Sequence, residues 1–292
     1  MIFCKLKFKH LLIITVLIVT SCGKENTDNN PVVNLLPKKY NEACFLMTHN
    51  AMNSKEKGFS IPNQTLSVFN QLNRGVRGLM LDTYDGSNGI ALTYHASSAL
   101  GQSKLVDVMQ EIKDFLLSNP NEVISIIFQN EGGNTQLQKA IDSIGLDTMT
   151  FIHTNGTDWP TIQTMVDSNQ RLVLFVEQNK LPRAAYLMYA WGTVFDTHYD
   201  YNTVSEFDAS INRGGSGSKE LYLVNHWLQK EILPGVAVPD STLAPQANTR
   251  SVVSKRVQDC SSANHHFINF IGVDFFHIGD AKAVVDSINL AQ

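Results

Sequence analysis

The sequence predicts an α/β fold, a distorted or incomplete (β/α)8 barrel of the TIM type, formed as a single domain by residues 39–292. Apolar segments of strand character alternate with segments of helical periodicity, which implies parallel strands joined by right-handed crossovers. At least seven such strands over about 250 residues favour a barrel over an open, doubly wound sheet. No glycine-rich fingerprint follows the first strand, which weighs against a dinucleotide-binding fold.

The expected elements follow one another along the chain. The segments expected to form strands are 45–48, 77–84, 123–128, 172–176, 194–195, 221–224 and 267–275, and an eighth strand lies near 150–152 or is missing. The segments expected to form helices are 63–73, 103–118, 135–144, 162–167, 183–189, 248–258 and 281–290. The clearest helix is 103–118, because its apolar residues fall on one face and Pro120 follows its end. The continuous apolar segment 123–128 is typical of a strand buried on both faces.

The N-terminus has the pattern of an export signal. In residues 1–21, three lysines precede an apolar stretch that is too short to span a membrane comfortably. The stretch ends in Val-Thr-Ser-Cys, which resembles a bacterial lipobox and implies cleavage before Cys22 and acylation of that cysteine. The alternative is an ordinary secretory signal in which Cys22 has no role. Residues 22–38 are expected to form a flexible tether, so we expect an exported protein, lipid-anchored on the periplasmic side or at the cell surface.

The charge of the chain bears on its partners. The formal net charge is −4, so no basic surface for nucleic acid is expected. Residues 1–21 hold three of the 23 basic residues and none of the 27 acidic ones, so the remainder carries a net charge of −7. Because anionic membranes repel such a chain, the lipid anchor would have to hold it at a membrane.

Two cysteines remain if Cys4 leaves with the signal and Cys22 is acylated. Cys44 precedes the first strand and Cys260 ends a helix before the last strand. In a closed barrel these positions are neighbours at one end, so a disulfide is expected as one possibility in an exported protein. The alternative is two buried thiols.

Polar residues lie at or directly after the carboxyl ends of the expected strands, where barrel enzymes place their chemistry. Capping and turn formation explain most single polar residues after a strand, but seven strand ends with carboxylates, amides or histidines point to a site. The segments concerned are His49-Asn50, Asp82–Asp85 with Tyr94-His95 after them, Gln129–Glu131, Glu177-Gln178, Asp196–His198, Asn225–Trp227, and Asp274 with His277 beyond it. Two histidines with a carboxylate between them suit general acid–base chemistry.

These motifs carry a resemblance to a known family. Thr48-His49-Asn50, the segment 74–86 and Tyr94-His95 resemble the X region of phosphatidylinositol-specific phospholipase C. The segments 225–227 and 273–276 are similar to those of secreted, single-domain bacterial members of that superfamily, so the resemblance covers most of residues 40–290. It implies a distorted (β/α) barrel. It also implies cleavage of a phosphodiester by the neighbouring inositol hydroxyl, giving a cyclic phosphate and diacylglycerol.

The resemblance also implies roles for single residues. His49 matches the first catalytic histidine, the general base or transition-state stabiliser, and His95 matches the second, the general acid. Asp274 matches the carboxylate that orients the first histidine. A carboxylate in an apolar strand needs a partner, and His49 on the adjacent first strand is the obvious one. Asn50 and Asp82 match two calcium ligands of the metal-dependent members, so a divalent cation, calcium, is the expected cofactor.

The chain departs from the metal-dependent pattern at two positions. Met80 stands where that pattern has a carboxylate, and Gln129 where it has a glutamate. Three outcomes follow: a weak metal site completed by Glu131 or Glu177, an arginine standing in for the metal, or a protein that binds without turnover. The candidate arginines are Arg77 and Arg183, and the residues expected to bind substrate are Trp227, His226 and Arg183.

Three functions remain open from the sequence. The first is a lipid-anchored phosphodiesterase that acts on phosphatidylinositol. The second is a related phosphodiesterase that acts on another lipid headgroup or on a glycerophosphodiester. A glycerophosphodiester phosphodiesterase would be expected to show His-Arg-Gly where this chain has His-Asn-Ala. The third is an inactive surface lipoprotein that binds inositol or glycans.

Overall fold

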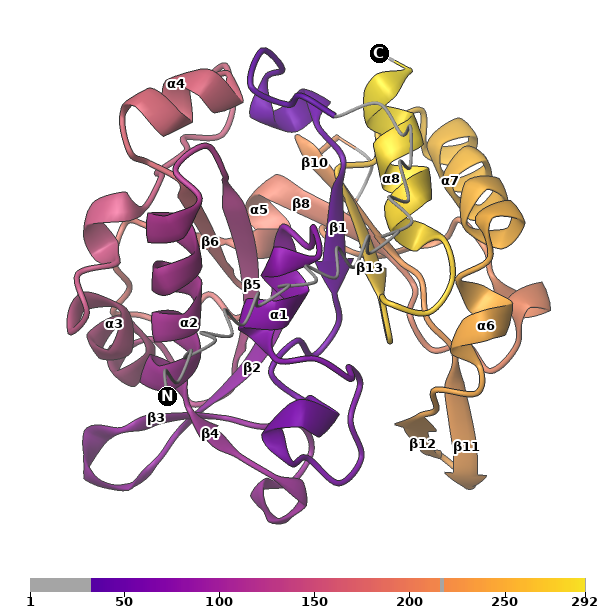
Figure 1. The fold of residues 1–292 in the computed structure, drawn as a ribbon, viewed down its shortest axis with the longest axis horizontal. Helices are drawn as coiled ribbons and strands as arrows, with labels where there is room; N and C mark the ends of the chain where they lie inside the picture. Colours follow the sequence, from indigo (N-terminus) through magenta and orange to yellow (C-terminus); the bar gives the residue numbers. More distant parts are fainter. Residues whose placement is uncertain (1–32, 216–217, 292) are drawn as a thin grey trace, which may run out of the picture. The chain divides into compact units, whose positions relative to one another are not determined.

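A curled, mainly parallel sheet is the framework of the fold (Figure 1). The computed structural model describes residues 33–215 and 218–291, so the predicted signal peptide and Cys22 lie outside the described residues. The strands lie side by side in the order β7 (Leu187–Tyr189), β6 (Leu172–Val176), β5 (Ile124–Asn130), β2 (Gly78–Asp85), β1 (Phe45–Thr48), β13 (Phe270–Val273), β10 (Leu221–Asn225), β8 (Val194–Thr197) and β9 (Ile211–Arg213). The described strands at the two ends of this order, β7 and β9, are not paired with each other, which confirms the predicted incomplete barrel.

The pairing of β1 with β13 positions two residues of the candidate site. β1 pairs with β13 in parallel, with Phe45 opposite Phe270 and Thr48 opposite Val273. The backbone nitrogen of His49 then donates to the carbonyl of Val273 at 3.0 Å. Both strands therefore end at the same level, and the residues that follow them, His49 and Asp274, become neighbours although 225 positions separate them.

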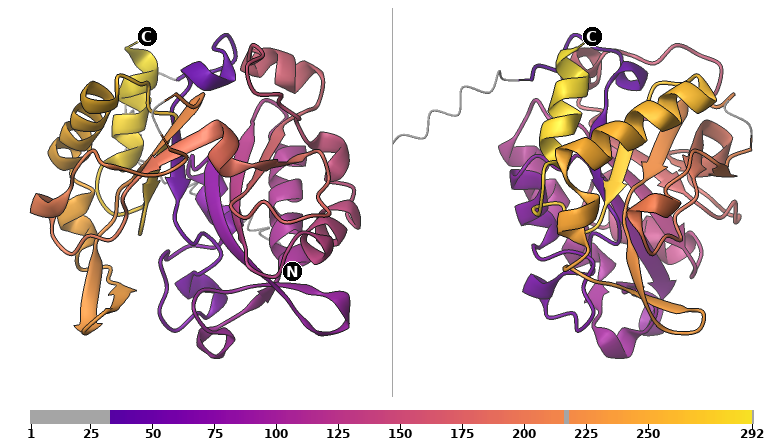
Figure 2. Two further views of the ribbon diagram at one scale, coloured as in Figure 1. Left: turned by 180° about the vertical axis from the view of Figure 1, so that it is seen from behind. Right: turned by 90° about the vertical axis from the view of Figure 1, so that its right-hand side faces the viewer.

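Helices cover the outer face of the sheet (Figures 1 and 2). Their bounds are α1 (Val68–Asn73), α2 (Leu105–Ser118), α3 (Thr135–Asp142), α4 (Ile162–Asp167), α5 (Ala190–Thr193), α6 (Ala244–Ala247), α7 (Arg250–Asn264) and α8 (Ala281–Leu290). The apolar face expected for α2 is buried, from Leu105 to Leu116. One core lies between the helices and the sheet, and a second lies inside the barrel around Phe45, Phe175 and Phe270.

Two expected helices differ from the structure, and the eighth strand is the missing one of the two alternatives. The segment expected as a helix from 63 to 73 is helical only in α1, because Ser67 caps it and the preceding residues run along the barrel mouth. The segment expected as a helix from 183 to 189 ends in strand β7, which pairs with β6 through Leu187 and Leu174. No described strand forms near 150–152, where Thr150 makes a single isolated bridge to Leu172.

Small strands extend the sheet at the carboxyl end of β2. β3 (Ala91–Thr93) pairs with β2, and β4 (Ser103–Lys104) pairs with β3, both in antiparallel orientation. A separate two-stranded hairpin follows β10 and consists of β11 (Gln229–Leu233) and β12 (Val236–Pro239). Figure 1 shows this hairpin and the β3–β4 segment projecting at the same end of the barrel.

The two candidate disulfide cysteines are free thiols. Cys44 and Cys260 are both buried, so the alternative of two buried thiols describes them. The backbone of Cys44 is held by the side chain of Asn289, whereas Sγ of Cys260 lies 3.9 Å from the carbonyl of Asp208. Burial raises the pKa of both thiols.

Residues 33–292 form one compact unit that contains all the hydrophobic clusters. The end of the stretch expected to be a tether belongs to it: Leu35 and Leu36 pack against the inner core, and the carbonyl of Leu36 accepts from Gln163 of α4. No helix in the described part of the chain combines the length and the hydropathy that a bilayer span requires.

Candidate active site

A pocket of about 240 Å³ opens at the carboxyl ends of the barrel strands. Because the strands are parallel, the residues that follow them converge on this end. The pocket is lined by His49, Asn50, Asn63, Met80, Leu81, Asp82, His95, Ile127, Gln129, Glu177, Tyr199, Arg213, Trp227, Gln229, Pro239 and Asp274. It thus brings together five of the six residues predicted for catalysis or metal binding, all but Glu131.

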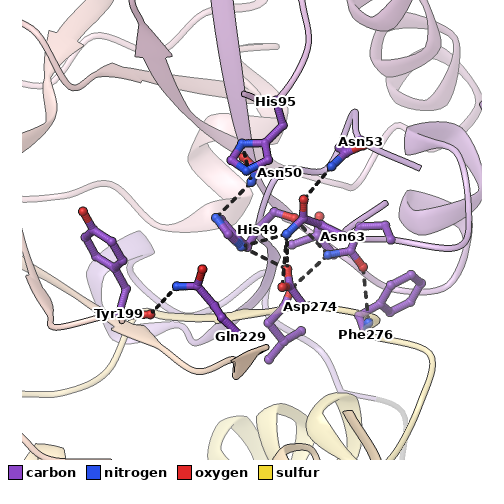
Figure 3. A network of polar contacts seen from close by, with 12 residues as sticks. His49, Asn50, Asn53, Asn63, His95, Tyr199, Gln229, Asp274 and Phe276 are labelled. Carbon is purple, nitrogen blue, oxygen red and sulfur yellow. Dashed lines mark hydrogen bonds and ion pairs between the residues drawn. The ribbon is translucent and has the colours of Figure 1, made fainter. Parts of the chain in front are cut away.

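The expected pairing of His49 with Asp274 is present (Figure 3). Nδ1 of His49 lies 3.0 Å from Oδ1 of Asp274, which is only 5% exposed. Asn63 donates from Nδ2 to both carboxylate oxygens at 3.1 Å. Because a carboxylate can only accept, Nδ1 of His49 carries a proton and Nε2 is left free to accept one.

The second histidine has a carboxylate of its own. Nδ1 of His95 lies 3.0 Å from Oδ2 of Asp82, which is 4% exposed. The side chain of His95 is 37% exposed and that of His49 is 21% exposed, so His95 lies nearer the mouth of the pocket. The ring centroids are 6.4 Å apart. Asp82, predicted as a metal ligand, therefore orients a histidine.

Asn50 lies between the two histidines. Its Nδ2 atom is 3.1 Å from Nε2 of His49 and 3.1 Å from Nδ1 of His95. Its backbone is left-handed, with φ at 46°, a conformation that asparagine tolerates better than most residues. This turn directs the amide into the pocket.

Trp227 forms one wall of the pocket. Its ring stacks on His49 with centroids 3.9 Å apart and an interplanar angle of 8°. This contact holds the imidazole plane and leaves Trp227 3% exposed. His226, also predicted to bind substrate, points the other way: it is fully buried, its Nε2 atom lies 2.9 Å from the carbonyl of Ala247, and burial lowers its pKa to about 4. That prediction is wrong because alternate residues of an extended chain face opposite sides.

Arg213 is the arginine that reaches the pocket, and the sequence did not single it out. Its guanidinium contacts both carboxylate oxygens of Glu177, at 3.0 and 3.1 Å, and Oδ2 of Asp196 at 2.5 Å. It stacks over Trp191 with 4.2 Å from Cζ to the ring centroid. Burial raises the pKa of Glu177 to about 7, against the opposing attraction of Arg213. The one arginine charge is thus matched by two carboxylates.

The arginines that the sequence proposed lie elsewhere. Arg77 pairs with Glu122 at 2.6 Å beside the start of β2, at the opposite end of the barrel from the pocket. Arg183 does not line the pocket, and its buried Nη1 atom has no partner among the described residues. Arg213 lies outside the segments expected to form strands. Only the antiparallel pairing of β9 with β8 places Arg213 opposite Asp196.

The residues for a cation are few. Asp82, Asn50, Gln129 and Glu177 line the pocket, but both oxygens of Glu177 are engaged by Arg213. Met80 stands on the same side of β2 as Asp82 and offers only a thioether. Glu131 does not line the pocket, since it is exposed and accepts from Nε2 of Gln129 at 3.1 Å. In the described residues, no group of three or more histidine, cysteine or acidic side chains suits a metal ion. This set, with one carboxylate already bonded to His95, does not fit a calcium site of ordinary affinity.

Comparisons with known proteins identify the family and the fold. The family described as PI-PLC X matches residues 35–289. The PI-PLC X domain-containing protein 1 of Arthroderma benhamiae is 27% identical over 272 residues, which cover 86% of each chain. A protein of the same fungus described as an uncharacterized secreted protein is 26% identical over 245 residues, 76% of this chain and 54% of that one. The phosphatidylinositol-specific phospholipase C of Listeria monocytogenes superposes with a TM-score of 0.58 at 17% identity, over 87% of this chain and 94% of that one, which shows a common fold.

Proposed function

Because the chain belongs to the PI-PLC X family, we propose that it is a phosphodiesterase of the phospholipase C type that cleaves phosphatidylinositol. One observation carries the proposal: two histidines face one pocket, and each has a carboxylate 3.0 Å from Nδ1. Such a pair can take a proton from an attacking hydroxyl and give one to a leaving alkoxide.

The chemistry assigns one histidine to each proton. Nε2 of His49 takes the proton of the inositol hydroxyl next to the phosphate, and the hydroxyl oxygen forms a bond to phosphorus. The bond from phosphorus to the glycerol oxygen breaks, and His95 protonates that oxygen. The products are a cyclic inositol phosphate and diacylglycerol, so atoms and protons balance. Asp274 and Asp82 are positioning residues: Asp274 holds His49 in the tautomer whose Nε2 accepts a proton, and Asp82 stabilises the imidazolium of His95, which gives the proton on Nε2.

Charge that develops on the phosphate needs donors close by. The amide of Asn50 lies between the histidines and can donate to a non-bridging oxygen, and a protonated His95 adds a positive charge. The proposed proton transfers by His49 and His95 need no metal ion. If calcium binds, Asp82, Asn50 and Gln129 would hold it and it would neutralise phosphate charge.

The rest of the pocket suits a polyol. Gln129 offers an amide group to ring hydroxyls, and Glu177, held by Arg213, adds carboxylate oxygens to the lining. Arg213 is held by two carboxylates and has little charge to spare for a further phosphate. We therefore expect an inositol ring without additional phosphates as the headgroup.

Export and anchoring belong to the same proposal. A relative is described as secreted, and the N-terminal sequence pattern predicts a signal peptide with acylation at Cys22. An anchored phosphodiesterase would meet its substrate in the plane of a membrane.

The test is to incubate residues 33–292 with phosphatidylinositol and follow cyclic inositol phosphate by phosphorus NMR. His49→Ala and His95→Ala should each lower kcat by about 100- to 10,000-fold. His265→Asn is the matched control, because it removes an exposed histidine away from the pocket and asparagine tolerates its left-handed backbone. Release of a different headgroup would favour another lipid substrate. Binding of inositol without turnover would contradict the proposed phosphodiesterase activity.

A further inference from the structure

A buried asparagine lies behind the His49–Asp274 pair, and the proposed proton transfers do not involve it. Asn63 is 1% exposed, and its Nδ2 atom lies 3.1 Å from each carboxylate oxygen of Asp274 (Figure 3). The same atom lies 3.4 Å from Nδ1 of His49, but both nitrogens carry protons, so this contact is no hydrogen bond. The polar partner of the Asn63 amide nitrogen is therefore the carboxylate.

A second asparagine fixes which way this amide points. Nδ2 of Asn53 lies 2.8 Å from the carbonyl oxygen of Ile61 and 2.7 Å from Oδ1 of Asn63. Because a carbonyl oxygen can only accept, Asn53 must turn its nitrogen toward Ile61, and this nitrogen donates its other proton to the oxygen of Asn63. The nitrogen of Asn63 then faces Asp274. Donation thus runs in one direction, from Asn53 through Asn63 to the carboxylate.

The backbone of Asn63 is tied to the same strand end. Its carbonyl accepts from the backbone nitrogen of Phe275 at 2.9 Å, and its own nitrogen donates to the carbonyl of Asn53 at 2.9 Å. Phe275 has a left-handed backbone, with φ at 46°, which a bulky residue adopts only where its surroundings impose it. Asn63 thus holds Asp274 through its side chain and the residue after Asp274 through its backbone.

Gln64, the next residue, holds the strand ends themselves. It is fully buried, and its Nε2 atom donates to the carbonyls of His49 and Val273 at 2.9 and 3.0 Å. These bonds and the pairing of β1 with β13 do not involve the side chain of Asn63. Replacing that side chain therefore removes the support of the carboxylate and leaves the support of the two strands.

We propose that Asn63 is a positioning residue whose amide holds the carboxylate of Asp274 in the orientation that accepts from Nδ1 of His49. Asn53 supports this role by fixing the amide. The proposal rests on the proposed function, because a fixed carboxylate serves a histidine that acts as a base. When Nε2 of His49 takes the proton of the inositol hydroxyl, the imidazolium forms beside a carboxylate that is already aligned. Without Asn63, the carboxylate is free to rotate away from the histidine.

The first test replaces the amide by an apolar side chain of similar size, in residues 33–292, the compact unit. On a short-chain phosphatidylinositol below its micellar concentration, kcat of Asn63→Leu should fall about 10- to 100-fold, the cost of a misplaced catalytic group. KM should stay within about threefold, because Asn63 is only 1% exposed. A raised KM with unchanged kcat would overturn positioning and make Asn63 a substrate-binding residue.

Asn289→Leu is the matched control. Asn289 is 4% exposed, and its side chain bonds the backbone nitrogen and carbonyl of Cys44 at the amino end of β1, away from the pocket. The control should lower the melting temperature as Asn63→Leu does, but keep the parent's kcat. An equal loss of kcat in both variants would overturn positioning, because general destabilisation would then explain it.

Two further variants test the direction of donation and the route through Asp274. The carboxylate of Asn53→Asp can only accept, so it should turn the amide of Asn63 around and lower kcat about tenfold. Asn289→Asp, which loses the same kind of bond to a backbone carbonyl, should keep kcat. In an Asp274→Ala background, Asn63→Leu should change kcat less than about threefold, because residues that act through each other are not additive. Unchanged kcat in Asn53→Asp, or full multiplication of the two losses, would overturn the proposal.

A measurement on the free protein separates positioning from the proposed activity. The proton on Nδ1 of His49, identified by its absence in His49→Ala, should give a resolved proton NMR signal in the parent and in Asn289→Leu, because an aligned bond to a buried carboxylate slows its exchange with water. In Asn63→Leu and Asn53→Asp the signal should broaden beyond detection. This pattern in a parent that cleaves no phosphatidylinositol would leave the orienting role of Asn63 standing and overturn the phosphodiesterase. An unchanged signal in both variants would overturn the orienting role.

Discussion

Replacing Asp274 by asparagine tests whether this carboxylate orients His49 for catalysis. The carboxylate accepts from His49 at 3.0 Å and, with both oxygens, from Asn63 at 3.1 Å. An asparagine has one acceptor oxygen for these two donors. If its amide nitrogen turns toward His49, Nδ1 must accept and the ring proton moves to Nε2, which is the atom needed as the base.

The size of the effect follows from the charge that Asp274 supplies. When His49 takes the substrate proton, its imidazolium lies beside the carboxylate. Two unit charges about 4 Å apart at an effective dielectric constant of about 20 attract each other by about 4 kcal/mol. Since 1.36 kcal/mol corresponds to a factor of ten, kcat of Asp274→Asn should fall about 1,000-fold. KM should change little, because Asp274 is only 5% exposed.

The assay follows cyclic inositol phosphate from monomeric and vesicle substrate, with thermal unfolding measured on the same samples. Asp286→Asn is the matched control, since it removes a carboxylate paired with Lys282 on α8, away from the pocket. It should keep the parent's kcat. A folded Asp274→Asn protein whose kcat stays within tenfold of the parent would refute the orienting role.

Three other predictions concern the metal, the pH dependence and the packing. The double variant Met80→Glu, Gln129→Glu adds two carboxylates around Asp82, because Met80 lies on the same side of β2 as Asp82 and Gln129 is the register partner of Asp82 on β5. Measured by calorimetry, the calcium Kd should fall from about 1 mM or weaker in the parent to about 10 μM in the variant. Micromolar calcium binding by the parent would contradict this prediction. The folded state raises the pKa of Glu177 from 4.5 to about 7, so it holds this proton to higher pH than the unfolded chain does; the free energy of unfolding should fall as the pH rises from 4.5 to 7, and Glu177→Gln should remove that slope in urea titrations. Gly132→Ala should lower the free energy of unfolding by about 2 kcal/mol or more in the same titrations, because a Cβ there would collide with backbone atoms of β2; an unchanged midpoint would contradict it.

The fold could be predicted from the sequence because the apolar strand segments and the helical periodicity both indicated alternating strands and helices. The apolar segment that became β5 and the one-faced periodicity of α2 need no tertiary context to be recognised. The segment 183–189 misled because it is short, and pairing with β6 decided its conformation. The helix expected from residue 63 starts later, because the side chain of Asn63 binds Asp274 in the pocket and its segment is not helical.

The candidate site was predictable where residues lie toward or directly after the carboxyl ends of strands. His49 and Asp274 directly follow β1 and β13, Asp82 lies in the second half of β2, and the parallel register brings the three together. Arg213 and Asn63 do not, because each reaches the pocket from a loop or an antiparallel edge strand whose course the sequence pattern does not reveal. His226 shows the opposite error, since it follows a strand but faces the core.

The order of the strands links completion of the fold to completion of the site. His49 follows the first barrel strand and Asp274 the last, and they meet only after β13 has docked between β1 and β10. His95, Asp82 and Asn50 all come from the first third of the chain and could approach one another earlier. A chain that ends before β13 would therefore retain most pocket residues but leave His49 without its carboxylate, free to take either tautomer. In the proposed mechanism, base catalysis by His49 therefore requires the fully folded barrel, because the pairing of β1 with β13 brings Asp274 to His49.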